Sequence, residues 1–190
     1  MPAGTRLAAA IHLAIMSRNE TLPDAEQLMS ALIEQIRGNI KPGTGIIGIF
    51  TGGVWVAERL HAALGIEVPL GTIDIAFYRD DYVRRGLAGN VKPSDIPFDV
   101  TDRDIVLVDD VLYTGRTIRA ALNELFDYGR PGRVMLAALV DRGGRQLPVA
   151  PQFVGAELNV DDDELVSLQR EADGSLQLSI KARAQASGQP

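Results

Sequence analysis

Two adjacent carboxylates, Asp109 and Asp110, follow the apolar run Ile105–Val108 and are the clearest candidates for chemistry in this chain. An unpaired charge at the end of a buried strand costs on the order of several kcal/mol, so these acids need a polar partner. Two neighbouring ribose hydroxyls can donate to both carboxylates, and a magnesium ion bound to those hydroxyls would offset the remaining charge. Taken alone, the pair could also be a solvated acidic turn or a metal-only site.

The segment Thr114–Thr117 follows at the predicted start of a helix, where free backbone N–H groups and the helix dipole suit an anion. Thr114 and Thr117 add hydroxyl donors, and Gly115 allows the backbone to approach closely. A helix N-cap would explain only one of the threonines. The spaced glycine and lysine of a P-loop are missing. The segment therefore indicates a phosphate site beside the acid pair.

The elements that position these residues alternate between apolar strands and amphipathic helices. This alternation predicts an α/β fold, with a parallel twisted sheet covered by helices on both faces. Ligand-binding loops are then expected at the carboxyl ends of the strands, where Thr51–Gly53, Asp109–Thr117 and Asp141–Arg145 converge. The expected helices are 24–37, Val54–Leu64 and 117–128, and the expected strands are Ile46–Phe50, Leu70–Tyr78, Ile105–Asp109 and Val134–Val140.

A single domain is expected over residues 1–190, because this length suits one hydrophobic core. Within it, residues 1–23 form an N-terminal leader, 79–95 a long loop typical of a mobile lid, and 184–190 a disordered tail. Three short strands form a small hood: Phe153–Glu157, Leu165–Gln169 and Leu176–Ile180.

Composition excludes several classes of protein. The chain has no cysteine, so it has no disulfide framework, thiolate zinc site or cysteine nucleophile. Its net charge of −6 opposes non-specific attraction to nucleic acid or to an anionic membrane. No apolar run approaches the roughly 20 residues that span a bilayer. We therefore expect a cytoplasmic protein without a membrane partner.

The stretch Val106–Thr117 resembles the motif that binds phosphoribosyl pyrophosphate (PRPP) in type I phosphoribosyltransferases. The resemblance extends over about residues 26–168 and is closest to the bifunctional pyrimidine operon regulatory protein and uracil phosphoribosyltransferase family. The segments that point to this branch are Tyr78–Asp81, Asp95–Pro97, Gly129–Pro131, Val140–Gly143, Arg145 and Leu147-Pro148.

This resemblance implies an enzyme of pyrimidine salvage that joins uracil to PRPP, forming UMP and pyrophosphate. It implies Mg²⁺ carried by PRPP, with no direct protein ligand, and a homo-oligomer. Lys92 would close over the pyrophosphate, although as a lone loop lysine it could equally be solvated. The implied roles are ribose binding by Asp109 and Asp110, PRPP binding by Thr51, Gly52, Val111, Leu112, Tyr113, Thr114, Gly115, Arg116 and Thr117, and base binding by Arg142 and Val166.

The chain departs from the family pattern at three places. Many relatives have Thr-Arg-Gly where this chain has Thr51-Gly52-Gly53, a histidine where it has Gly144, and Gly-Lys-Asn where it has Gly155-Ala156-Glu157. Each change removes or opposes positive charge, on which RNA affinity depends. We therefore expect an enzyme rather than the alternative, a UMP-sensing attenuator that binds RNA. Specificity for another base stays open.

Overall fold

The computed structural model describes residues 22–75 and 93–182. Its centre is a five-stranded parallel sheet with the strand order β2-β1-β3-β4-β5. The predicted α/β fold with a parallel sheet is therefore confirmed. The strands of this sheet are β1 (Gly45–Ile49), β2 (Gly71–Ile73), β3 (Asp104–Leu112), β4 (Arg133–Asp141) and β5 (Phe153–Glu157).

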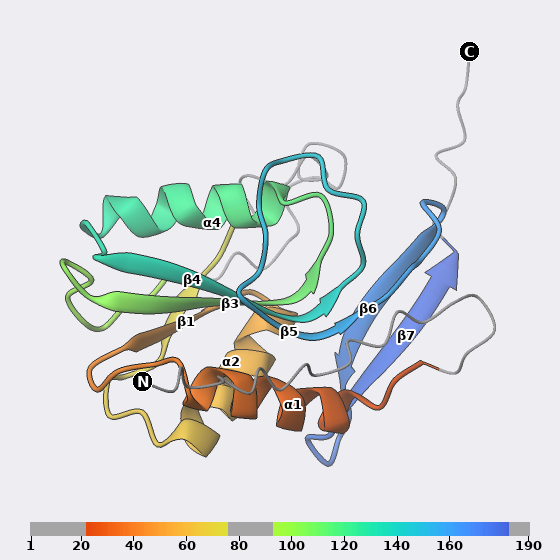
Figure 1. Cartoon of the computed structure of the whole chain (residues 1–190), viewed down its shortest axis with the longest axis horizontal. Coiled ribbons are helices and arrows are strands. Elements are labelled where there is room, and N and C mark those ends of the chain that lie inside the picture. The colour runs from red at the N-terminus through yellow and green to blue at the C-terminus, as the bar shows by residue number, and fades with distance from the viewer. Residues whose placement is uncertain (1–21, 76–92, 183–190) are drawn as a thin grey trace, which may run out of the picture.

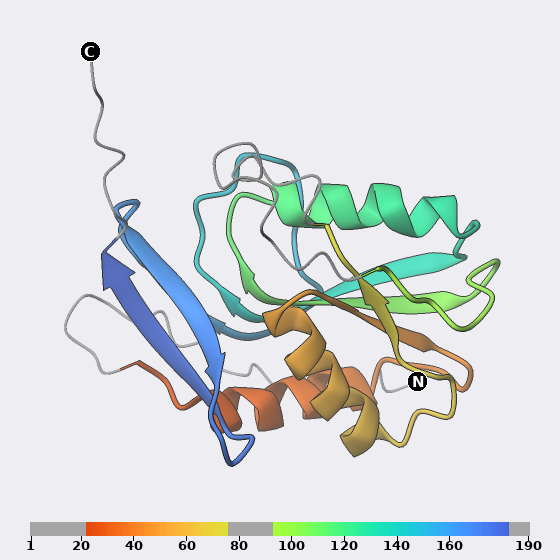
Figure 2. The ribbon, with the colours of Figure 1, turned by 180° about the vertical axis from the view of Figure 1, so that it is seen from behind.

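Helices cover both faces of the sheet, as Figures 1 and 2 show from opposite sides. Helices α1 (Ala25–Arg37) and α2 (Gly52–Leu64) lie on one face, and α4 (Arg116–Asp127) lies on the other. Helix α1 begins where sequence predicts, because the side chain of Asp24 accepts a hydrogen bond of 2.9 Å from the amide of Gln27. Each face has its own apolar cluster, with Leu32 and Val106 in one and Leu107 and Ile118 in the other.

The hood is an antiparallel hairpin of β6 (Glu164–Arg170) and β7 (Leu176–Ala182). The third strand expected in the hood, Phe153–Glu157, instead pairs with β4 as the outer strand of the parallel sheet. Alternate residues of both strands face the α1 and α2 side of the core and are buried: Val166, Leu168, Leu176 and Leu178. Two ion pairs also hold the hairpin. Glu26 on α1 binds Arg59 on α2 at 3.0 Å and accepts from the amide of Leu176 at 2.9 Å, while Arg170 pairs with Glu58.

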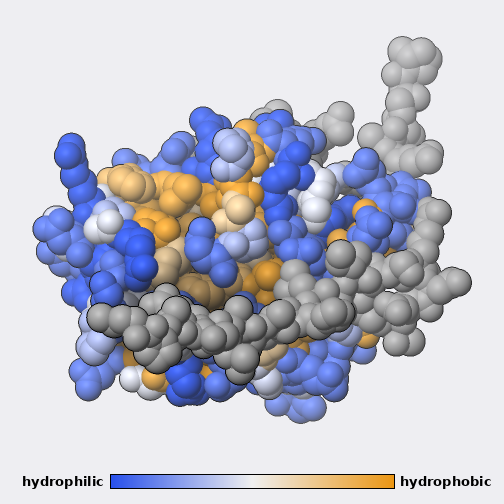
Figure 3. Space-filling view, in the orientation of Figure 1, coloured by the Kyte–Doolittle hydropathy of each residue, from blue (hydrophilic) through white to orange (hydrophobic). Residues whose placement is uncertain are grey.

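One edge of the sheet is closed by a side chain. The amide of Gln35, on α1, donates to the carbonyl of Val154 at 2.8 Å and accepts from its N–H at 3.2 Å. These are the two backbone groups that a neighbouring strand would bind, so Gln35 satisfies the outer edge of β5 there. Figure 3, in the same orientation as Figure 1, shows apolar side chains between α4 and α1 on this side of the molecule.

The strands β2 and β3 differ most in length from the predicted ones. Strand β3 continues to Leu112, three residues beyond the predicted end at Asp109, because β4 pairs with it up to Asp141. Strand β2 covers only Gly71–Ile73 of the predicted Leu70–Tyr78. Residues 1–21, most of the predicted loop 79–95 and the tail 184–190 lie outside the described residues. In the described ranges, no helix is long and apolar enough to cross a bilayer.

Candidate active site

Both acids lie inside β3, whereas the predicted strand ends at Asp109. Asp109 is 5% exposed, and its carboxylate accepts a hydrogen bond of 3.1 Å from the amide of Asp110. Asp110 is less buried, because successive strand residues face opposite sides of the sheet. The pairing with β4 thus fixes the backbone of both acids near the carboxyl edge of the sheet.

The loop after β1 meets the acid pair directly. A Cβ placed on Gly52 would lie 2.1 Å from Oδ2 of Asp110, so the carboxylate rests against the glycine backbone. The peptide bond between Phe50 and Thr51 is cis, and Thr51 is the N-cap of α2 without a side-chain capping bond. The positive end of α2 therefore faces the same edge as the carboxylate of Asp110.

The predicted phosphate segment lies at the start of α4. Gly115 is the N-cap with a φ of 88°, a left-handed conformation that glycine adopts without strain. The hydroxyl of Thr114 accepts a hydrogen bond of 3.3 Å from the amide of Arg116. The side chain of Arg116 is exposed and donates to Gln146 at 3.1 Å. The segment thus presents a helix N-terminus and hydroxyls at this edge, as an anion site requires.

A second loop, 142–152, crosses over the phosphate segment and holds it. The amides of Gln146 and Leu147 donate to the carbonyl of Thr114 at 3.0 and 3.1 Å. Arg145 donates to the carbonyls of Tyr113 and Val149 and forms an ion pair with Asp141. This role of Arg145 was not predicted from the sequence. The spacing of Asp141 and Arg145 by four residues was the one signal that could have suggested a pair.

The predicted base residue Arg142 is 4% exposed and stands in the wall of a cavity of about 520 Å³. Its two terminal nitrogens donate to the carbonyls of Glu164 and Asp161 at 2.7 and 2.8 Å, and its Nε has no hydrogen-bond partner. Val166 is 4% exposed and packs into the core cluster below the hood. The cavity is lined by Asp141–Arg145, Glu157–Val160 and Asp162.

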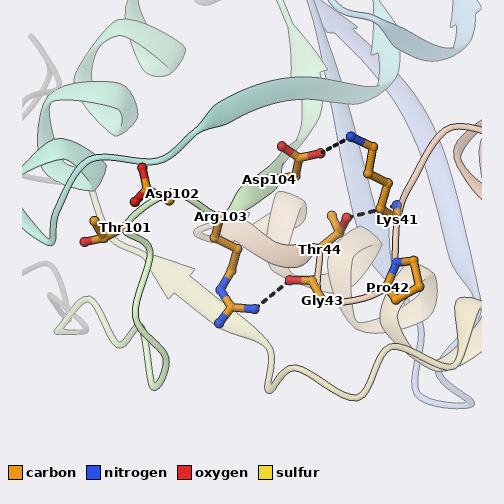
Figure 4. Close-up of a pocket in the computed structure, with 8 residues that line it drawn as sticks. All are labelled: Lys41, Pro42, Gly43, Thr44, Thr101, Asp102, Arg103 and Asp104. Carbon is orange, nitrogen blue, oxygen red and sulfur yellow. Dashed lines mark hydrogen bonds and ion pairs between the residues drawn. The ribbon is translucent and has the colours of Figure 1, made fainter.

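Another hollow, of about 410 Å³, lies at the opposite edge of the sheet, at the amino ends of β1 and β3 (Figure 4). Its cations are already paired. Arg103 donates to the carbonyl of Gly43 at 2.6 Å, and Lys41 lies 4.0 Å from the carboxylate of Asp104. This hollow is therefore separate from the three converging loops.

Two predicted features remain to be placed. Lys92 lies outside the described residues. Among residues 22–75 and 93–182, no three His, Cys, Asp or Glu side chains form a cluster that could hold a metal. A magnesium ion that enters on a substrate would lie beside the carboxylates of Asp109 and Asp110 and offset their negative charge, without a direct protein ligand.

The structure explains the residue type at two of the three departures from the family pattern. Ala156 is 6% exposed in the core cluster, so it is a packed residue of β5 rather than a missing surface cation. A Cβ on Gly144, whose φ is 65°, would lie 2.3 Å from the ring of Tyr113. The ring therefore occupies the space that a side chain at this position would need.

Comparisons with known proteins agree with this geometry. The phosphoribosyl transferase domain family matches residues 18–168. The bifunctional protein PyrR of Pseudomonas paraeruginosa is 47% identical over 169 residues, which cover 86% of this chain and 99% of that protein. The bifunctional protein PyrR of Nitrosococcus oceani is 56% identical over 146 residues, covering 76% of this chain and 80% of that protein.

Solved structures agree as well. A purine phosphoribosyltransferase from Pyrococcus horikoshii has a TM-score of 0.53 and 31% identity, covering 70% of this chain and 82% of that one. A hypoxanthine phosphoribosyltransferase from Staphylococcus aureus shares the fold, with a TM-score of 0.59 and 17% identity over 77% and 80% of the two chains. The resemblance seen in Val106–Thr117 is thus confirmed, and the chain belongs to the PyrR family of type I phosphoribosyltransferases.

Proposed function

We propose that this protein is a cytoplasmic uracil phosphoribosyltransferase that converts uracil and PRPP to UMP and pyrophosphate. The observation that carries the proposal is the contact between Gly52 and Asp110, which joins the loop after β1 to the acid pair of β3. A substrate with a ribose between a phosphate and a pyrophosphate needs its three binding regions at one edge, and this contact supports such an arrangement.

In the proposed reaction, the bond from C1′ to pyrophosphate breaks as a bond from a uracil nitrogen to C1′ forms, and the proton of that nitrogen passes to the departing pyrophosphate or to water. The side chains of Asp109 and Asp110 accept hydrogen bonds from the ribose hydroxyls. The segment Thr114–Thr117 holds the 5′-phosphate through backbone amides and hydroxyls. Rate enhancement comes from positioning and from stabilisation of developing charge, without a protein nucleophile.

The departing pyrophosphate would contact the loop of Thr51 and Gly52 at the start of α2. Backbone amides there replace the arginine of many relatives. Lys92 keeps the role expected from sequence, as a cation over the leaving group. Mg²⁺ carried by PRPP would neutralise pyrophosphate charge, and the acid pair fits beside it.

Uracil is proposed for the cavity beside Arg142. The buried guanidinium has one donor, Nε, without a partner, and a pyrimidine carbonyl is an acceptor of suitable chemistry. The relatives named PyrR, which match most of this chain, also favour the pyrimidine branch.

A base screen tests this proposal. The purified protein is incubated with PRPP, Mg²⁺ and labelled uracil, hypoxanthine or orotate, and nucleotide products are separated. UMP should form with the highest kcat/KM. Preference for another base would correct the specificity, and absence of product from every base would refute the enzyme.

RNA binding is a second candidate, because the relatives are named as bifunctional proteins and because Ala156 proves to be a core residue. The loss of a histidine at Gly144 and the net charge of −6 still oppose it. A gel-shift titration with the leader RNA of a pyrimidine operon, with and without UMP, tests whether the protein binds RNA in addition to acting as an enzyme. Tight, salt-sensitive binding enhanced by UMP would establish the regulatory function.

A further inference from the structure

We propose that Tyr113 is a positioning residue that couples the phosphate segment to the base cavity by holding the guanidinium of Arg142. The inference rests on the proposed function only for the identity of the base. Tyr113 was expected to contribute to PRPP binding as part of its loop, whereas the structure directs its side chain to the neighbouring site.

The first observation is the stacking of the two side chains. Cζ of Arg142 lies 4.1 Å from the centroid of the Tyr113 ring. Because Arg142 is 4% exposed, this cation–π contact is largely shielded from water, where such contacts are strongest. The ring holds the face of the guanidinium, and the carbonyls of Asp161 and Glu164 hold its terminal nitrogens. The orientation of Nε is thereby determined.

The second observation is how the ring itself is held. The hydroxyl of Tyr113 lies 3.4 Å from the carboxylate of Asp162, and Arg145 binds the Tyr113 carbonyl. On its remaining side, the ring lies where a Cβ on Gly144 would be, at 2.3 Å. The ring can therefore occupy this position only because residue 144 is glycine.

These contacts join two sites through one residue. The backbone of Tyr113 immediately precedes the phosphate segment Thr114–Thr117, and its ring fixes a wall residue of the base cavity. Binding of phosphate at the segment would restrict Tyr113 and so pre-organise Arg142. Thermodynamic linkage then requires the base to favour PRPP binding by the same factor.

Three variants test the contribution of the Tyr113 ring separately from that of its neighbours. Tyr113→Phe keeps the ring, and Tyr113→Leu keeps apolar volume without an aromatic face. Gly144→Ala displaces the ring. Gly143→Ala is the matched control for backbone strain, because its φ of 72° is also left-handed but nothing lies within 4 Å of its Cβ. The changes in KM and in hydrogen exchange that are predicted below should therefore be larger in Gly144→Ala than in Gly143→Ala.

In steady-state kinetics, Tyr113→Leu and Gly144→Ala should raise the KM for uracil about tenfold at saturating PRPP, while the KM for PRPP at limiting uracil changes less than about threefold. Tyr113→Phe should restore a KM for uracil within about twofold of the parent protein. A comparable rise in the KM for PRPP at limiting uracil, or no change in the KM for uracil in Tyr113→Leu, would overturn the coupling role.

Hydrogen exchange at Nε–H of Arg142 gives a readout that is independent of activity. The resonance is assigned by its absence in Arg142→Lys. Its exchange should accelerate at least about tenfold in Tyr113→Leu and Gly144→Ala and stay unchanged in Tyr113→Phe. Unchanged exchange in Tyr113→Leu would refute the proposal even in an active enzyme. If the parent protein converts no base, the proposed function fails while this measurement still decides the role of Tyr113.

Discussion

The carboxylate of Asp110 fills the space that a side chain on Gly52 would occupy, with only 2.1 Å between Oδ2 and an added Cβ. A side chain at position 52 is therefore incompatible with this placement of the aspartate. In this chain the acid pair and the loop after β1 form a continuous surface. The missing arginine is thus a change in shape as well as in charge.

Gly52→Ala should push the carboxylate of Asp110 away from α2 and raise the KM for PRPP about tenfold or more. Gly38→Ala is the control, because nothing lies within 4 Å of its Cβ and its φ is −79°. Steady-state kinetics at saturating uracil measures the effect. A KM for PRPP within about twofold of the parent would contradict the assigned position of Asp110.

The double variant Asp109→Asn and Asp110→Asn should lower kcat/KM for PRPP by more than about a hundredfold, because both acceptors for the ribose hydroxyls lose their charge. The fold should persist, since asparagine keeps the shape of each side chain. Circular dichroism and thermal unfolding check this point, and Asp127→Asn, on the exposed end of α4, is the control. Surviving activity would show that the ribose binds elsewhere.

Glu26→Ala should lower the free energy of unfolding by about 1 kcal/mol. Glu26 pairs with Arg59 and accepts from the amide of Leu176, so its loss loosens the hood, but both side chains are about 40% exposed and water screens the pair. Urea unfolding measures the change. Glu34→Ala breaks the more exposed pair with Arg37 and should have almost no effect.

Leu107→Ala should cost about 3 kcal/mol of unfolding free energy, because this β3 side chain is fully buried. Leu165→Ala, at a position that is 46% exposed, should cost less than about 0.5 kcal/mol. Similar losses in both variants would mean that β3 does not form the centre of the core.

The fold and the edge where the three loops meet could be predicted, because alternating apolar strands and helices have few compact arrangements. The carboxyl end of β3 could not be predicted. Asp110 and Val111 read as a loop, yet they continue the strand because β4 pairs with it up to Asp141, and such long-range pairing leaves no local signal.

The contacts between loops were also hidden in the sequence. The stacking of Tyr113 on Arg142 depends on the path of residues 142–152 over the phosphate segment. Gly144 was recognised as a departure, but only as a lost charge. Ala156 was interpreted in the same way, whereas its burial in the core shows that packing determines its size.

The side-chain amide of Gln35 acts as a one-residue substitute for a sixth strand at Val154. A strand from another chain could add to β5 at this point only by displacing Gln35, which would unpair an amide on α1 as well as the strand. Copies of this protein should therefore not extend the sheet by adding a strand beside β5, and the same side chain should protect this edge from aggregation during folding.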